Sequence, residues 1–175
     1  PSLLCLGIVE PRKNQSFLLE VCEELWAGGL TFDLNLVGRS NPHFGAPIIA
    51  RMKSLARARP GLVYHAAADD ATVARLYATT RASVFPTIAD GGGRLLREAL
   101  WMGVPCVCSD LPVLRENADG GGCLPVALND QSAWTAALRR VLTDDIFLAQ
   151  LGQAATSRPL PRWAEAARTL AQALP

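Results

Sequence analysis

Short apolar runs alternate along this chain with longer segments in which apolar residues recur at helical spacing. The run at 3–8 is continuous, as is typical of a strand covered on both faces of a sheet. In 15–26, by contrast, apolar side chains recur every three or four positions, which predicts an amphipathic helix. The alternation predicts an α/β fold, a Rossmann-like parallel sheet with helices on both faces.

The breaks between these segments set the expected element boundaries. Strands are expected at 3–8, 31–37, 62–65, 82–85, 104–108 and 123–126. Helices are expected at 15–26, 47–59, from Asp69 or Asp70 past Tyr77, from the 91–93 glycines through Trp101, from Asp130 or Ser132 to Leu142, at 144–155 and at 162–174, and 110–117 is expected to be a loop. Parallel strands place their carboxyl ends at one sheet edge, where ligands bind. The loops that would gather there are 8–13, 38–45, 65–70, 86–93 and 109–117.

Charge and cysteine content exclude several classes of function. The net charge of +1 over 175 residues gives no basic surface for nucleic acid. No apolar stretch reaches the roughly 18 residues of a membrane span. The five cysteines lack paired zinc-site spacing, and Cys106 and Cys108 fall inside an apolar run, so we interpret them as buried small hydrophobes. A reducing, cytoplasmic location is the resulting expectation.

The segment 86–93, Pro-Thr-Ile-Ala-Asp-Gly-Gly-Gly, is the sharpest local feature. Its glycines allow a ligand close to the backbone, and the helix behind them presents free N–H groups and the positive end of its dipole. Phosphate is the natural ligand, and a flexible turn is the alternative. The pattern matches neither a P-loop nor a dinucleotide-binding loop. Asp-Gly-Gly-Gly recurs at 119–122 in an unlike context, so it is not a structural repeat.

Two carboxylates flank the first glycine run. Asp90 precedes the glycines, and Glu98 follows in the otherwise apolar stretch 95–100. A carboxylate near the sheet-facing side of a helix is costly unless it accepts hydrogen bonds. Glu98 is therefore either a functional group or a solvated residue paired with Arg94 or Arg97.

Residues 84–116 read VFPTIADGGGRLLREALWMGVPCVCSDLPVLRE. This stretch resembles the signature region of the large retaining glycosyltransferase family of GT-B fold, the E-x7-E family called glycosyl transferases group 1. That family shows a strand, Pro-Ser/Thr, an E-G-F-G-type loop, a Glu-Ala helix and then Gly-x-Pro-V-V-x-S-D. The matching positions are Pro86, Thr87, Gly91, Gly93, Glu98, Ala99, Gly103, Pro105, Val107, Ser109, Asp110 and Glu116. Outside this stretch, Gly7 with residues 12–14, the 36–38 turn and 157–167 are also similar, so the resemblance covers essentially the whole chain.

The resemblance implies that residues 1–175 form one nucleotide-sugar-binding domain, the C-terminal half of a GT-B fold and a fragment of a longer enzyme. An N-terminal domain of the same parent chain would hold the acceptor. Glu98 would accept hydrogen bonds from the two ribose hydroxyls, as a carboxylate can. Asp90 would contact the transferred sugar, and Lys13 would stabilise the departing diphosphate.

The same resemblance implies a donor site completed by Gly7, Arg12, Arg94 and the amides of Gly91, Gly92 and Gly93. The implied reaction is retaining transfer of a hexosyl-type group from a nucleoside-diphosphate sugar, without cofactor or metal, in the synthesis of a bacterial polysaccharide or glycoconjugate. The isolated domain is expected to catalyse little.

Three positions depart from the family pattern. Asp90 stands in place of glutamate, Ile8 in place of an arginine, and Arg94-Leu95 in place of Leu-Pro. Arg94 is either a replacement cation or a solvated side chain at a helix start. The alternative function is accordingly a degenerate, non-catalytic glycosyltransferase-like module with an interaction or regulatory role.

Overall fold

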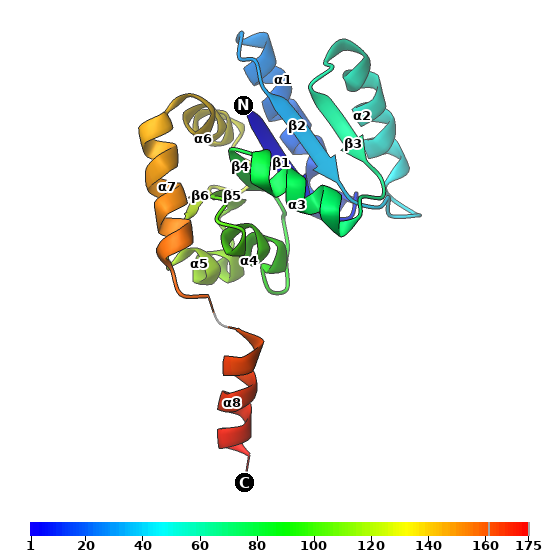
Figure 1. Cartoon of the computed structure of the whole chain (residues 1–175). Coiled ribbons are helices and arrows are strands. Elements are labelled where there is room, and N and C mark those ends of the chain that lie inside the picture. Colours follow the sequence, from blue (N-terminus) through cyan, green and yellow to red (C-terminus); the bar gives the residue numbers. More distant parts are fainter. Residues whose placement is uncertain (161, 175) are drawn as a thin grey trace.

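The computed structural model describes residues 1–160 and 162–174. Pro161, inside the compared stretch 157–167, and Pro175, the end of the predicted domain, lie outside the described residues. Figure 1 shows an α/β arrangement with an additional helix at the C-terminal end. The strands are β1 (Ser2–Leu6), β2 (Asp33–Val37), β3 (Leu62–His65), β4 (Ala82–Phe85), β5 (Cys106–Ser109) and β6 (Cys123–Val126). The helices are the 3-10 turn η1 (Pro11–Lys13), α1 (Gln15–Ala27), α2 (Ala46–Ala58), α3 (Asp70–Thr79), α4 (Arg94–Trp101), α5 (Pro112–Ala118), α6 (Gln131–Thr143), α7 (Asp145–Ser157) and α8 (Trp163–Ala173).

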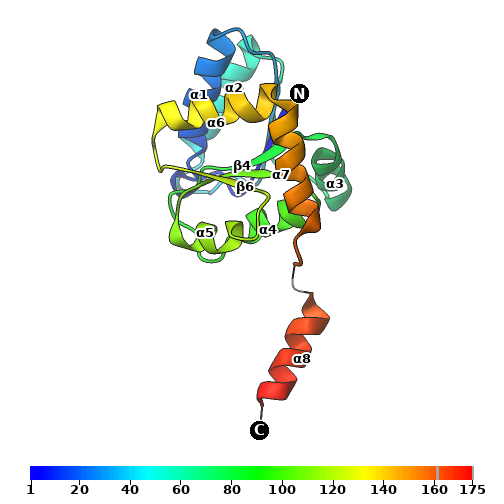
Figure 2. The ribbon, with the colours of Figure 1, turned by 90° about the vertical axis from the view of Figure 1, so that its left-hand side faces the viewer.

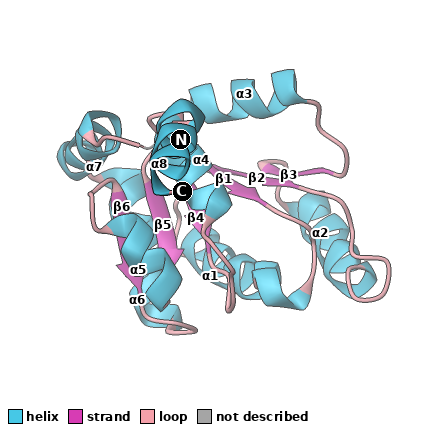
Figure 3. Ribbon diagram, turned by 90° about the horizontal axis from the view of Figure 1, so that it is seen from below, coloured by secondary structure: helices cyan, strands magenta, loops and turns pink. Residues whose placement is uncertain are grey.

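The six strands form one parallel sheet in the order β3-β2-β1-β4-β5-β6. Successive residues of β1 point to opposite faces, and both faces are covered: Leu3 packs with α1, α2 and α6, whereas Leu4 packs with α3 and α4. Figure 3 shows α3 on one side of the sheet and α1 and α2 on the other. The predicted Rossmann-like sheet with helices on both faces is confirmed.

The expected loop at 110–117 is wrong in part, because α5 occupies Pro112–Ala118. Pro112 lies at the start of this helix, where its fixed φ suits a helix and its missing N–H costs nothing. Leu114 is completely buried beside α4 and β5. A helix of seven residues is too short to show the periodicity that predicts longer helices, so its anchoring in the core was invisible in sequence.

Strand order decides where a ligand site can form. Numbering runs outward in both directions from the β1–β4 pair, so the loops after β1 and β4 leave the sheet toward opposite faces. Doubly wound sheets bind ligands in the crevice at such a switch point. In this chain the two loops are 7–14 and 86–93, which contain most of the residues expected to bind the donor.

At the C-terminal end, α8 extends away from the sheet and its covering helices (Figure 1, Figure 2). Trp163 at its start is 92% exposed. Among the described residues, no helix combines the length and apolar character that a membrane crossing requires.

Candidate functional site

The loop after β1 carries Lys13 into the switch-point crevice. Pro11 begins the 3-10 turn, and Asn14 ends it with a φ of 58°, a left-handed conformation that asparagine tolerates better than most residues. The Gln15 side chain donates to the carbonyl oxygen of Ile8 at 2.9 Å, which ties the start of α1 to the loop. Lys13 is 8% exposed, and its Nζ lies 4.7 Å from the centre of the Phe85 ring.

The loop after β4 is anchored to that turn. Thr87 is completely buried, and its Oγ1 lies 2.9 Å from the carbonyl oxygen of Arg12 and 2.8 Å from that of Ala89. The amide of Ile88 also donates to the Arg12 carbonyl, at 3.0 Å. The two bonds to the Arg12 carbonyl join residues that are at least 75 positions apart in sequence. They fix the position of Lys13 relative to the glycine run.

Asp90 lies at the centre of the arrangement. Its Oδ2 accepts from Lys13 Nζ at 2.7 Å, and its Oδ1 accepts from the amides of Gly92 and Gly93 at 3.1 and 2.7 Å. Arg12 Nη1 lies 3.9 Å from Asp90 Oδ2, and Arg12 Nη2 lies 2.7 Å from Glu10 Oε1. The aspartate side chain is 12% exposed and that of Lys13 10%, so bulk water screens this pair weakly.

These contacts determine the ionisation of Asp90. Burial by itself would raise the pKa of the carboxyl group. The hydrogen bond from Lys13 and those from the Gly92 and Gly93 amides outweigh burial, and they lower the pKa of Asp90 to about 2. Asp90 is therefore an anion throughout the physiological range.

A cavity of about 530 Å³ opens beside this pair. Its lining contains seven of the predicted site residues: Gly7, Arg12, Lys13, Asp90, Gly91, Gly92 and Arg94. Ile8 and Leu95, two of the departures from the family pattern, also line it. Gly93, whose φ is 61°, donates its amide to Asp90 and directly precedes α4. The first amides of a helix have no partner within it, so α4 adds donors and a positive dipole end to the three cations here. The arrangement suits an anion such as phosphate.

Glu98 is not part of this cavity wall. It lies half-buried on α4, one turn after Arg94, and lines a neighbouring cavity of about 560 Å³ between α4 and α8. Arg94 lines both cavities. Burial, and to a smaller extent the nearby charge of Glu98, raises the pKa of the Tyr77 hydroxyl. Within the described residues, this hydroxyl makes no hydrogen bond. The structure thus places Glu98 adjacent to the other predicted residues rather than among them.

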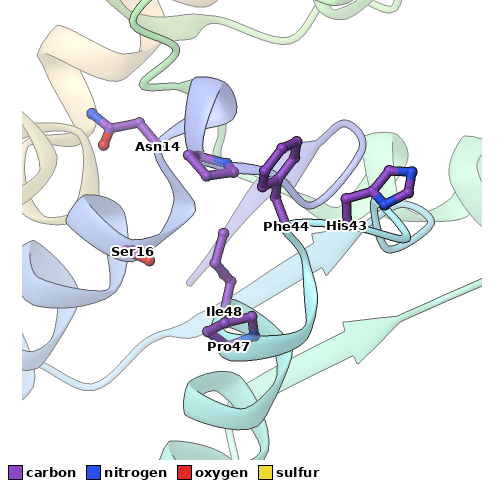
Figure 4. A pocket seen from close by; sticks show the side chains of 7 residues that line it. Asn14, Ser16, His43, Phe44, Pro47 and Ile48 are labelled. Carbon is purple, nitrogen blue, oxygen red and sulfur yellow. The ribbon is translucent and has the colours of Figure 1, made fainter.

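A third cavity lies on the other side of η1 (Figure 4). It measures about 430 Å³, and Phe44 and His43 from the loop before α2 line it together with Ile48 and residues near the start of α1. In Figure 4 the His43 ring points away from Ile48. No residue predicted to bind the donor lines it. In the part of the chain that the structure describes, no three His, Cys, Asp or Glu side chains gather as metal ligands.

Sequence reasoning missed three contributors to the site. Thr87 was a motif position without a role, Phe85 was only a strand residue, and Glu10 was not considered. Thr87 bonds to Arg12 and Phe85 lies beside Lys13, and both partners are distant in sequence. Glu10 pairs with Arg12, which lies near Asp90 only in the folded chain. Only the position of Thr87, directly after a strand and before the glycine run, offered a signal.

Comparisons with known proteins identify the family of this chain. Residues 1–144 match the family glycosyl transferases group 1. The chain is 30% identical over 118 residues to the serotype-specific mannosyltransferase WbdA of Escherichia coli, a match covering 67% of this chain and 14% of that protein. It is 29% identical over 143 residues to the O-antigen chain mannosyltransferase B of Escherichia coli, covering 81% of this chain and 37% of that protein.

The fold is similar to that of sucrose-phosphate synthase from Thermosynechococcus elongatus. The TM-score is 0.83 at 24% identity, over 99% of this chain and 44% of that one. The chain thus spans less than half the length of each of these proteins. A six-stranded parallel sheet and a family match over residues 1–144 lead to one conclusion: the chain belongs to the glycosyl transferases group 1 family, and its fold is the Rossmann-like fold of GT-B glycosyltransferases.

Proposed function

We propose that this chain is the donor-binding domain of a retaining glycosyltransferase that takes a hexosyl group from a nucleoside-diphosphate sugar. One observation carries the proposal: Lys13, Arg12, Arg94 and the amino end of α4 converge on a single cavity at the switch point of the sheet. A diphosphate carries the charge that such a cavity attracts. Because both curated relatives are mannosyltransferases, a mannosyl group is the hexosyl group that we expect.

In the proposed reaction, Lys13 stabilises the negative charge that develops on the departing diphosphate. A preorganised cation in a weakly solvated site is most effective where charge grows in the transition state. Arg12, Arg94 and the α4 dipole add to the same field, so the proposed chemistry uses protein charges in place of a metal. Glu98 is proposed to hold the ribose hydroxyls, with the nucleoside extending from the cradle past Arg94.

The acceptor is proposed to bind an N-terminal domain of the parent protein. This chain spans 14% and 37% of its two mannosyltransferase relatives, so a cleft between two domains has room to form in the whole protein. Single-domain catalysis is accordingly expected to be weak, and nucleotide binding is the property to measure.

One observation favours a second candidate, a non-catalytic member of the family. Asp90 already uses Lys13 and two loop amides, so the cradle is internally satisfied. In that case nucleoside diphosphates would leave the melting temperature unchanged.

Calorimetric titration with UDP, GDP and ADP distinguishes the candidates. We expect saturable binding of one nucleotide, weakened about tenfold or more by Lys13→Ala and by Glu98→Ala, because each removes a charge-assisted contact. Two surface variants are the matched controls. Lys53→Ala removes an exposed lysine of α2 and matches Lys13→Ala. Glu20→Ala removes an exposed glutamate of α1, which pairs with Arg51 of α2, and matches Glu98→Ala. Binding that survives both site substitutions would contradict the assignment of the site.

A further inference from the structure

The Asp90 carboxylate takes the place that a phosphate oxygen would take. Its two oxygens accept from Lys13 Nζ, from the Gly92 amide and from the Gly93 amide, at 2.7, 3.1 and 2.7 Å. A carboxylate and a phosphate oxygen both accept from ammonium groups and from amides at helix starts. The cradle therefore already holds an anion, the side-chain carboxylate of Asp90 from the same loop.

Occupancy by Asp90 and by phosphate is mutually exclusive at the loop amides. A backbone amide has a single hydrogen to donate. While Gly92 and Gly93 donate to Asp90, neither amide can donate to a ligand. The side chain of Asp90 is short enough to bond the amides two and three residues ahead, a common local arrangement for aspartate.

The charge of Asp90 also weakens the attraction of the site for phosphate. Three cations, Lys13, Arg12 and Arg94, face the cavity or its rim, together with Asp90, and Glu10 pairs with Arg12. The five groups sum to one positive charge, and removing the Asp90 charge doubles it. A diphosphate that enters the cavity is repelled by the Asp90 carboxylate. This carboxylate lies within hydrogen-bond distance of Lys13 Nζ and of the loop amides that the diphosphate would use.

We propose that the Asp90 carboxylate is an internal anion that occupies the phosphate cradle until the donor diphosphate displaces it, so that Asp90 sets the nucleotide affinity of the site. The inference rests on the proposed function and deepens it. The apparent affinity equals the intrinsic affinity multiplied by the fraction of molecules in which the cradle is free. When the diphosphate displaces the carboxylate, the carboxylate leaves the cradle. It is then available to a hydroxyl of the transferred sugar.

The test is calorimetric titration of the 175-residue chain with inorganic pyrophosphate and with UDP, GDP and ADP. Asp90→Asn and Asp90→Ser both remove the charge. Both keep a side-chain oxygen that can preserve the local turn, but a neutral oxygen binds Lys13 and the loop amides less strongly than a carboxylate, so a phosphate displaces it more easily. Either variant suffices if the other does not fold. We expect both to bind pyrophosphate and the preferred nucleotide at least about fivefold more tightly than the unaltered chain, by the occupancy argument.

Asp90→Glu keeps the charge and is expected to return the affinity to within about twofold of the unaltered chain, since occupancy by an anion is restored. Asp145→Asn is the control, because it removes a carboxylate that pairs with Arg81 on the surface, outside the cradle. Its affinities should not change.

The outcomes separate this inference from the proposed function. Nucleotide binding that Asp90→Asn and Asp90→Ser leave equal or weaker would overturn the inference alone, because Asp90 would then build the cradle rather than occupy it. If the unaltered chain and all variants are folded and bind neither pyrophosphate nor any nucleotide, the proposed function fails and the inference fails with it.

Discussion

The chain contains the sequence Asp-Gly-Gly-Gly twice, at 90–93 and at 119–122, and the two copies have opposite surroundings. In the first copy, a Cβ added to Gly91 would meet nothing within 4 Å, and the loop lines the candidate donor cavity. In the second copy, added Cβ atoms would lie 2.8 Å from the Arg158 guanidinium at Gly120 and 2.7 Å from the Ala155 Cα at Gly122. Open backbone presents amides to a ligand, whereas packed backbone lets a helix approach.

The two aspartates differ as much as the glycines. Asp90 is 12% exposed and pairs with Lys13, while Asp119 is exposed on the surface beyond α5. In the second copy the charged partner is Arg158, whose Nη1 donates to the carbonyl oxygens of Asn117 and Gly121 at 2.7 and 2.9 Å. The same four residues thus serve a candidate anion site in one place and the packing of α7 in the other. A glycine-rich sequence indicates that other groups can approach the backbone closely. The tertiary neighbours determine whether a ligand or a helix does so.

The largest expected effect is that of Gly122→Ala, which tests the packed copy. Gly122 has a φ of 79° and its added Cβ would lie 2.7 Å from backbone of α7. A left-handed alanine and overpacking together are expected to lower the free energy of unfolding by about 3 kcal/mol. Urea denaturation measures this value.

Gly29→Ala is the matched control, since Gly29 also has a positive φ, of 85°, but its added Cβ would meet nothing within 4 Å. It should lose only the conformational part, about 1 kcal/mol. Equal losses in the two variants would show that packing against α7 does not matter.

The next effect is that of Asp90→Asn on stability, which tests the charge of the open copy. In the folded chain the pKa of Asp90 is about 2, below the roughly 3.9 of an unfolded chain. The stabilisation, roughly 2 kcal/mol, is therefore fully present above about pH 4 and is lost as the pH falls toward 2. The substitution should lower stability at pH 7 and flatten the pH dependence between about pH 5 and 2.

Urea denaturation at several pH values, with Asp119→Asn as the control, measures this difference. The control should follow the unaltered chain at every pH. If Asp90→Asn also follows it, the ion pair with Lys13 contributes nothing to folding.

Gly93→Ala should have a smaller effect. Its φ of 61° is unfavourable for alanine, but the nearest group to an added Cβ, at 2.7 Å, is the end of the Asn117 side chain, which can move. We expect a loss of about 1–2 kcal/mol in unfolding free energy. Nucleotide affinity should fall as well, because the Gly93 amide shifts with the start of α4. Unfolding and calorimetric titration measure the two effects separately, and an unchanged affinity would argue against a role of this amide.

Gly91→Ala should have the smallest effect. Its backbone is outside the left-handed region, and an added Cβ would meet nothing within 4 Å. We expect a change in stability within about 0.5 kcal/mol. Denaturation of this variant beside Gly122→Ala compares the two copies directly, and a loss similar to that of Gly122→Ala would remove the distinction between open and packed glycine runs.

Much of the fold could be predicted because its signals are local. The continuous apolar run at 3–8 and the helical spacing in 15–26 each lie within one segment, and the structure has a strand and a helix there with bounds within two residues of those predicted. The seven-residue helix α5 and the turn η1 were missed, because neither is long enough to show a period. Within the site, the cavity around Lys13 and the glycine loop was predicted, whereas the place of Glu98 in a separate cavity was not.

By itself, the sequence determined the alternation of strands and helices, the position of the glycine loop after a strand, and the family resemblance. These properties depend on residue order over short distances. Only the tertiary structure decided that Asp90 pairs with Lys13, 77 positions away, and that the second glycine run packs against α7. The physical reason is that an ion pair or a close backbone approach depends on separation in space, which strand order sets and local sequence does not record.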